Sequence, residues 1–298
     1  MRTNRRRAIA ILIGLAILVP FASAPASAST LQRTWSAKLG TSGANGTIKL
    51  YAYTDGLGSY GSIRYSLKGL RKNATYTVRI RNGTCANPGT VAASLTSVLT
   101  SATGTVARDD SVSPLLMSRI WAAARKPTFI VKIGSGTSIR CAAFTFAHAT
   151  RVAVSGLGID LPVIRGTNAY PKCRVAMYLA RVAQPREPGV TFLYAHARTG
   201  MFLPLLTSWR NNRGASLIGR IVRVWTSDSY VSYYRIDRVR VASNAMAGVT
   251  SLARERLWLQ TSTGPNTSYP KLIAEAYRYK TLKTTYAASH PTARPISC

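Results

Sequence analysis

Short segments in which apolar and polar residues alternate recur along the first half of this chain, separated by turns rich in glycine and asparagine. Three of them are clear, at residues 47–51, 62–67 and 75–80. Alternation with a period of two residues is typical of a β-strand with one buried face. Strands repeated at this spacing between Thr30 and Ala147 predict a β-sandwich.

Eight further extended segments follow in the second half, enough to close a barrel and so remove free sheet edges. They are residues 152–154, 158–164, 173–182, 190–195, 216–225, 230–241, 256–260 and 271–279, with a short helix at 200–209 and a turn at 227–229. A length of 298 residues suits two domains. We therefore expect an all-β chain, with a sandwich over residues 29–147 and a closed β-barrel with short helices over 148–298.

Four strings in the second half carry a resemblance to a known family: Leu193-Tyr194-Ala195-His196, then residues 200–205, 257–262 and 271–276. Together they resemble the sortases. In that family one strand ends in the catalytic His, a helical turn containing Phe follows, a later strand ends in Thr-Cys, and an Arg opens the last strand. The resemblance implies that His196, Ser262 and Lys271 form the catalytic set, and that Thr261 and Phe202 belong to the substrate site.

Two of these catalytic positions are altered, since Ser262 stands where the family has Cys and Lys271 where it has Arg. A thiol has a pKa of ~8.5, so a neighbouring imidazolium holds a useful thiolate fraction, whereas a serine hydroxyl must lose its proton during attack. His196 would then act as a neutral general base. Lys271 keeps a positive charge for an oxyanion but lacks the planar fork of Arg.

The resemblance therefore implies an exported, serine-based peptide acyl transferase or hydrolase that acts on cell-envelope proteins and needs no cofactor. The alternative is a catalytically inactive envelope protein that binds peptides or anionic polymers. The mid-domain carboxylates are Asp228, Asp237 and Glu255. Spacing alone assigns none of them to orient His196.

The first half resembles the Cu/Zn superoxide dismutase fold in two strings, residues 69–85 and 138–144. Where that family has His ligands on its first strand, this chain has Arg79 and Arg81. A protonated guanidinium has no lone pair to give a metal, and the whole chain holds only three histidines. We expect a scaffold without metal.

Four cysteines, at positions 85, 141, 173 and 298, permit three pairings. Pairing Cys85 with Cys141 and Cys173 with Cys298 keeps each bridge inside one expected domain, and the second would fasten the C-terminal tail. A free Cys298 is the alternative. By position along the chain, neither Cys173 nor Cys298 replaces the thiol missing at residue 262.

Residues 1–28 have the form of a secretory signal peptide, with a basic start, an apolar run at 8–21 and the cleavage signal Ala26-Ser27-Ala28. An uncleaved membrane anchor is the alternative. Cleavage removes four arginines and no acid, which lowers the formal charge from +31 to +27. We therefore expect a secreted or extracytoplasmic, envelope-associated protein with peptide or protein substrates. Anionic envelope polymers or lipid headgroups are its expected neighbours, and the sequence has no nucleic-acid-binding motif.

Overall fold

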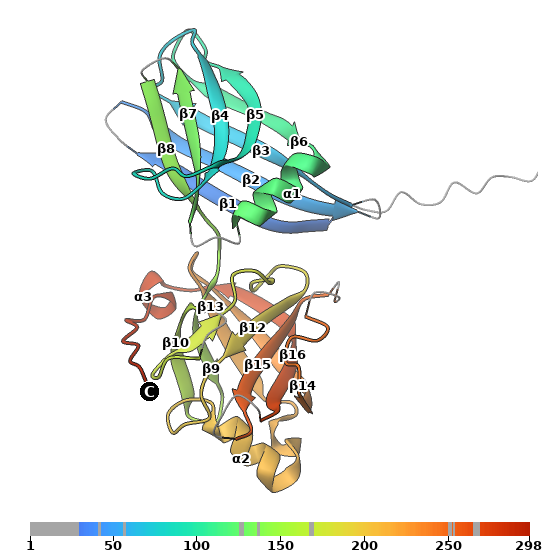
Figure 1. Ribbon diagram of the computed structural model, residues 1–298. Coiled ribbons are helices and arrows are strands. Elements are labelled where there is room, and N and C mark those ends of the chain that lie inside the picture. The colour runs from blue at the N-terminus through green and yellow to red at the C-terminus, as the bar shows by residue number, and fades with distance from the viewer. Residues whose placement is uncertain are drawn as a thin grey trace, which may run out of the picture.

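The computed structural model describes residues 30–298 except 41–42, 56–57, 125–127, 136–137, 167–169, 250–251, 253 and 265–268. The expected signal segment, residues 1–28, lies outside the described residues. The described chain forms two β units that follow one another in sequence (Figure 1). The prediction of an all-β chain, with a sandwich followed by a closed barrel with short helices, is confirmed. Among the described residues, no helix is both long and apolar enough to cross a membrane.

The first unit is a strongly curled sheet in the order β5-β4-β7-β8-β1-β2-β3-β6. β1 and β8 share only the pairs Ser36↔Thr145 and Ala37↔Phe144, so the sheet folds into two halves around one core. The helix α1 (Pro114–Ala124), which strand alternation does not predict, packs against β3, β4 and β5 and buries Met117 and Ile120 (Figure 1). The strands are β1 (Thr30–Gly40), β2 (Asn45–Asp55), β3 (Gly58–Lys68), β4 (Thr75–Asn82), β5 (Val91–Leu99), β6 (Val106–Val112), β7 (Phe129–Ser135) and β8 (Ser138–Thr145).

The second unit is a closed barrel in the order β10-β11-β12-β15-β16-β14-β13-β9. Its strands are β9 (Ala149–Val154), β10 (Ile159–Arg165), β11 (Ala176–Tyr178), β12 (Val190–Tyr194), β13 (Ile221–Thr226), β14 (Tyr230–Ala242), β15 (Arg256–Ser262) and β16 (Lys271–Lys283). Short helices are α2 (Leu203–Asn212), the 3-10 turn at Ala215–Leu217 and α3 (Tyr286–Ser289).

Two predicted barrel strands are shorter than expected. The segment 173–182 pairs in the sheet only over β11, and it starts no earlier than Ala176 because Arg174 has a φ of 65°, outside the extended region. The segment 216–225 begins as a 3-10 turn and becomes a strand only at Ile221, after Gly219 with a φ of 83°. Both differences arise from left-handed backbone that local alternation does not reveal.

The side chain of Arg33 joins the two units. It extends from β1 to the loop between β11 and β12, where its guanidinium donates to both carboxylate oxygens of Glu187 at 2.8 and 2.7 Å. It also donates to the carbonyls of Ala180 and Val182 at 3.0 and 2.7 Å, and lies 4.7 Å from the ring centroid of Phe146. Only 3% of Arg33 is exposed. A buried guanidinium with a hydrogen bond from each of its three nitrogens therefore joins the sandwich to the barrel.

His148 lies beside this junction, and its burial gives the fold a pH dependence. The ring stacks on Tyr178 at 5.1 Å, and Nδ1 is 3.0 Å from the Phe146 carbonyl. Burial, the largest effect, lowers the pKa of His148 below its ordinary 6.5. The folded protein then binds fewer protons than the unfolded chain near and below pH 6.5, so stability is full above that pH and falls as the pH drops.

We accordingly expect the free energy of unfolding to be smaller at pH 5.5 than at pH 7.5, as measured by urea denaturation. His148→Gln should reduce this difference, since Gln does not titrate. Part of the difference in unfolding free energy should remain in this variant, because burial also lowers the pKa of His196. An unchanged pH dependence in His148→Gln would contradict this assignment.

Candidate functional site at the strand ends

The register of two parallel strands brings the predicted site residues to one edge of the barrel. β12 and β15 run parallel, with Tyr194 opposite Gln260. Beyond that pair, the Ala195 amide donates to the Gln260 carbonyl at 3.1 Å and the Thr261 hydroxyl donates to the Ala195 carbonyl at 2.9 Å. His196 and Ser262 therefore lie at the neighbouring ends of β12 and β15, each two residues beyond the Tyr194–Gln260 pair.

Alternation along these strands places the site on the outer face of the barrel. Side chains facing the barrel core are Leu193, Ala195, Leu257, Leu259 and Leu272. Side chains in the outer apolar cluster are Phe192, Tyr194, Trp258 and Ile273. Because successive strand residues face opposite sides, Ser262 shares the outer face with Trp258, and Lys271 shares it with Ile273. Ser262 and Lys271 are direct cross-strand partners in the β15–β16 pair.

Ser262 and Lys271 contact one another. The Lys271 Nζ donates to the Ser262 Oγ over a long 3.5 Å, and the Ser262 hydroxyl donates to the Gly264 carbonyl at 2.8 Å. Burial lowers the pKa of Lys271 below its ordinary value. A lowered pKa raises the fraction of neutral amine, which is the form that accepts a proton.

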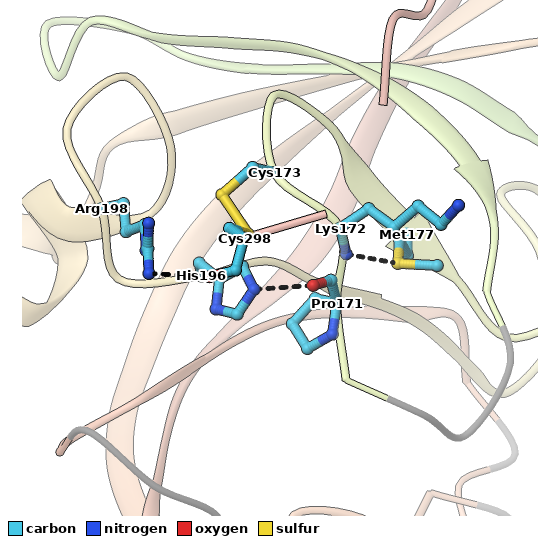
Figure 2. The surroundings of a disulfide bond; sticks show 7 residues. All are labelled: Pro171, Lys172, Cys173, Met177, His196, Arg198 and Cys298. Carbon is cyan, nitrogen blue, oxygen red and sulfur yellow. Dashed lines mark hydrogen bonds between the residues drawn. A yellow bond between two sulfur atoms is a disulfide. The ribbon is translucent and has the colours of Figure 1, made fainter. Parts of the chain in front are cut away.

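His196 is buried, with 8% of its surface exposed. Its Nε2 lies 2.6 Å from the Pro171 carbonyl (Figure 2), which only accepts, so Nε2 carries a proton and Nδ1 is left as the acceptor of the neutral ring. Burial, and to a smaller extent Arg198, lowers the pKa of His196, while the Pro171 carbonyl opposes this. Within the described chain, no hydrogen bond joins His196 to Ser262, although their strand ends are neighbours.

The carboxylates that were left unassigned are engaged elsewhere. Asp228 pairs with Arg186, Asp237 with Arg256, and Glu255 with both Tyr234 and Arg278. None of the hydrogen bonds found among the described residues links one of them to His196, whose ring nitrogen is oriented by a backbone carbonyl instead.

Thr261 and Phe202, the predicted substrate-site residues, are both fully buried in this structure. The Thr261 hydroxyl is hydrogen-bonded to the Ala195 carbonyl. Phe202 belongs to the barrel core, and its amide donates to the His196 carbonyl at 3.0 Å. Both residues fix the backbone around His196 from inside the barrel.

The disulfides join Cys85 to Cys141 and Cys173 to Cys298. The second lies against His196 (Figure 2), with a ring nitrogen and both sulfurs within 4.8 Å of one another. Both predicted pairings are confirmed, and the two cysteines expected not to replace the missing thiol are bonded to each other beside His196. β11 runs antiparallel to β12 with Met177 opposite Tyr194, so the residues before β11 lie beside those after β12. Cys298 lies 125 residues from its partner in sequence, and although the pair was predicted, spacing gave no sign that it lies beside His196.

A pocket of about 500 Å³ opens beside α2, next to the loop that follows His196. Its lining includes Leu157, Thr199, Leu203, Thr207 and Asn211, and none of the predicted catalytic residues. The candidate site is thus the outer strand edge and not this pocket.

The sequence matches no protein-family model, and it matches no curated protein. Among solved structures it is similar to the lid mutant of Streptococcus agalactiae sortase C1, at 16% identity over 44% of this chain and 67% of that chain, with a TM-score of 0.36. It is also similar to the group B Streptococcus pilus island 1 sortase C2, at 19% identity over 44% and 73%, TM-score 0.36. A third is Listeria monocytogenes sortase A, at 17% identity over 46% and 91%, TM-score 0.35. Similarity at this level does not reveal an activity, which depends on the residues at the strand ends.

Proposed function

We propose that this protein is an exported, sortase-like peptide acyl transferase or hydrolase of the cell envelope that uses Ser262 as its nucleophile. The observation that carries the proposal is the contact between the Lys271 amine and the Ser262 hydroxyl on the outer barrel face, at the strand end beside His196. A hydroxyl in contact with an amine of lowered pKa is the arrangement that serine–lysine acyl transfer requires.

The contacts suggest a different division of roles from that implied by the family resemblance. Lys271, in its neutral form, takes the proton of Ser262 as the Oγ attacks a peptide carbonyl carbon. The C–N bond of the peptide then breaks, the acyl group remains on Ser262 as an ester, and the leaving amine takes up a proton. That proton is the one Lys271 took from Ser262, and His196, the second titratable side chain at this edge, would relay it from the Lys271 ammonium to the amine. Transfer of the ester to an amine or to water completes the cycle and regenerates the Ser262 hydroxyl.

Mass spectrometry of a trapped ester tests the proposal. The protein should gain the acyl mass when it is incubated with an activated peptide ester or with peptides that copy the sorting signals of surface proteins. Fragmentation should place the added mass on Ser262, and Ser262→Ala should abolish the adduct. Ser155→Ala, at an exposed turn between β9 and β10, is the matched control and should acylate as the parent does. Absence of any adduct, or an adduct that persists in Ser262→Ala, would refute the proposal.

The charge distribution favours a second candidate, an inactive envelope protein that binds anionic polymers. The eight acidic residues whose side chains the structure describes are all in ion pairs with arginine, and the whole chain has nine acids against 40 Lys and Arg residues. Cations therefore outnumber acids over the surface, which favours polyanions. Failure to acylate, together with salt-sensitive retention on an anionic polymer, would select this candidate.

A further inference from the structure

The disulfide beside His196 differs from the other disulfide in what surrounds it. Among the described residues, Cys173, His196 and Cys298 are the one group of potential metal-ligating side chains that lie within 4.8 Å of one another. Two of these three atoms are sulfurs already bonded to each other, so the group as it stands is a disulfide in contact with an imidazole. Within the part of the chain that the structure describes, Cys85–Cys141 has no such neighbour.

The two sulfurs of this disulfide also differ in access. Cys298 is exposed on the C-terminal tail, whereas Cys173 is 8% exposed and belongs to the barrel core. An external thiolate therefore reaches the Cys298 sulfur first, and Cys173 becomes the leaving group. The leaving sulfur departs beside His196, and the guanidinium of Arg198 lies on the facing loop, at the Cys298 carbonyl (Figure 2). A thiolate leaves faster beside a cation, so His196 assists this step in its protonated form, together with Arg198.

Few other contacts hold the tail in place around the disulfide. The Cys173 amide donates to the Ile296 carbonyl at 2.9 Å, and the Ile296 amide donates to the Cys173 carbonyl at 3.4 Å. The Arg198 guanidinium donates to the Cys298 carbonyl over 3.4 Å. Ala293 also packs against the outer apolar cluster. Among the described residues, opening the S–S bond leaves only these hydrogen bonds and this packing to restrain residues 291–298.

We propose that Cys173–Cys298 is a redox-active disulfide that exchanges with an external dithiol, and that Cys173 is its buried, His196-assisted thiol. The first thiolate of the dithiol bonds to the Cys298 sulfur, the Cys173–Cys298 bond breaks, and its electron pair leaves on Cys173. The second thiolate then attacks the mixed disulfide and releases Cys298. Two electrons and two protons pass from the dithiol, which becomes a disulfide, to Cys173 and Cys298, which become thiols.

This inference goes beyond peptide acyl transfer and does not depend on it. The partner that reduces the Cys173–Cys298 disulfide would be a dithiol, and the partner that reoxidises the two thiols would be a disulfide. The proposal also predicts that the reduced protein has a thiol, that of Cys173, next to the His196 ring. This thiol would be a nucleophile distinct from Ser262.

Reduction of the folded protein by dithiothreitol tests the proposal. Samples are quenched with an alkylating reagent over time, and mass spectrometry follows each disulfide separately. Cys173–Cys298 should open at least about tenfold faster than Cys85–Cys141 in the same molecules, although each bridge has one exposed cysteine. Hydrogen exchange over residues 291–298 should rise in step with the opening of that bridge. Equal rates, or faster opening of Cys85–Cys141, would overturn the proposal.

Variants separate assistance by His196 from simple access. His196→Gln should slow the opening of Cys173–Cys298 by about three- to tenfold and leave Cys85–Cys141 unchanged, since a less stabilised leaving thiolate departs more slowly. Circular dichroism verifies that this variant is folded. If His196→Gln does not fold, two other variants are used instead. Cys298→Ser leaves Cys173 as a free thiol, and Cys85→Ser leaves Cys141 as a free thiol. Iodoacetamide should then modify Cys173 about tenfold faster than Cys141 at pH 7, and equal rates would refute the role of His196.

Failure here and failure of the acylation proposal are distinguishable. The reduction assay contains no peptide, and Ser262→Ala should open both disulfides at the parent's rates. A protein that forms the Ser262 ester but shows equal reduction rates would retain the proposed function and lose this inference. A protein with the rate difference but no ester would do the reverse.

Discussion

Arg33→Ala is expected to lower the free energy of unfolding by about 3–5 kcal/mol, because it removes one partner from a buried ion pair. Arg33 is 3% exposed and Glu187 15% exposed by side chain, and their 2.7 Å contact is supported by bonds to two carbonyls. Burial raises the pKa of Glu187, and the Arg33 charge opposes that rise. Without Arg33 the carboxyl must either stay charged without a partner or take up a proton. Urea denaturation at pH 7 measures the loss.

Arg64→Ala is the matched control for this variant. Arg64 also lies on a strand of the sandwich and also grips a carboxylate with two nitrogens, that of Asp109, but both side chains are at least half exposed. Exposed ion pairs contribute little to stability, so its removal should leave the denaturation midpoint nearly unchanged. The double variant Arg33→Ala, Glu187→Ala should recover part of the loss. If Arg33→Ala proved no more harmful than Arg64→Ala, the buried pair would not be what joins the units.

Local alternation is the part of this fold that the sequence revealed well. Residues 47–51, 62–67 and 75–80 all lie within strands, as do the segments that became β12, β14, β15 and β16. A strand with one buried face repeats every two residues, so its signal is contained in the segment itself. The closure of the barrel followed from the number of strands and the need to remove free edges.

What the sequence concealed depends on contacts between distant segments. Arg33 looked like one cation among many, since its partner Glu187 lies 154 residues away. The pairing of Cys173 with Cys298 was predicted, but its position beside His196 was not, because that contact depends on how β11 and β12 pair. The burial of Thr261 and Phe202 was also hidden, since it depends on which face of the barrel wall each side chain occupies.

Lys271→Ala is expected to slow acylation of Ser262 by about 10²- to 10⁴-fold, the usual range for loss of a general base. Lys271 is the side chain that donates to the Ser262 Oγ, and burial lowers the pKa of its amine. Because the neutral amine is the active form, the parent's acylation rate should rise with pH up to that lowered pKa and then level off. The rate constant for ester formation with an activated peptide ester, measured from pH 6 to 10, tests both statements.

Lys271→Arg decides between the two roles that a cation can have at this position. A guanidinium stays protonated, so it stabilises an oxyanion but cannot take the proton of Ser262. If Lys271 is the base, Lys271→Arg should be as slow as Lys271→Ala, and the rise of the rate with pH should disappear. Lys280→Ala, an exposed position on the same strand, controls for the loss of one charge and should acylate at the parent's rate. Full activity in Lys271→Arg would mean that a permanent cation is sufficient at position 271. Lys271 would then stabilise the oxyanion, and His196 would be the base.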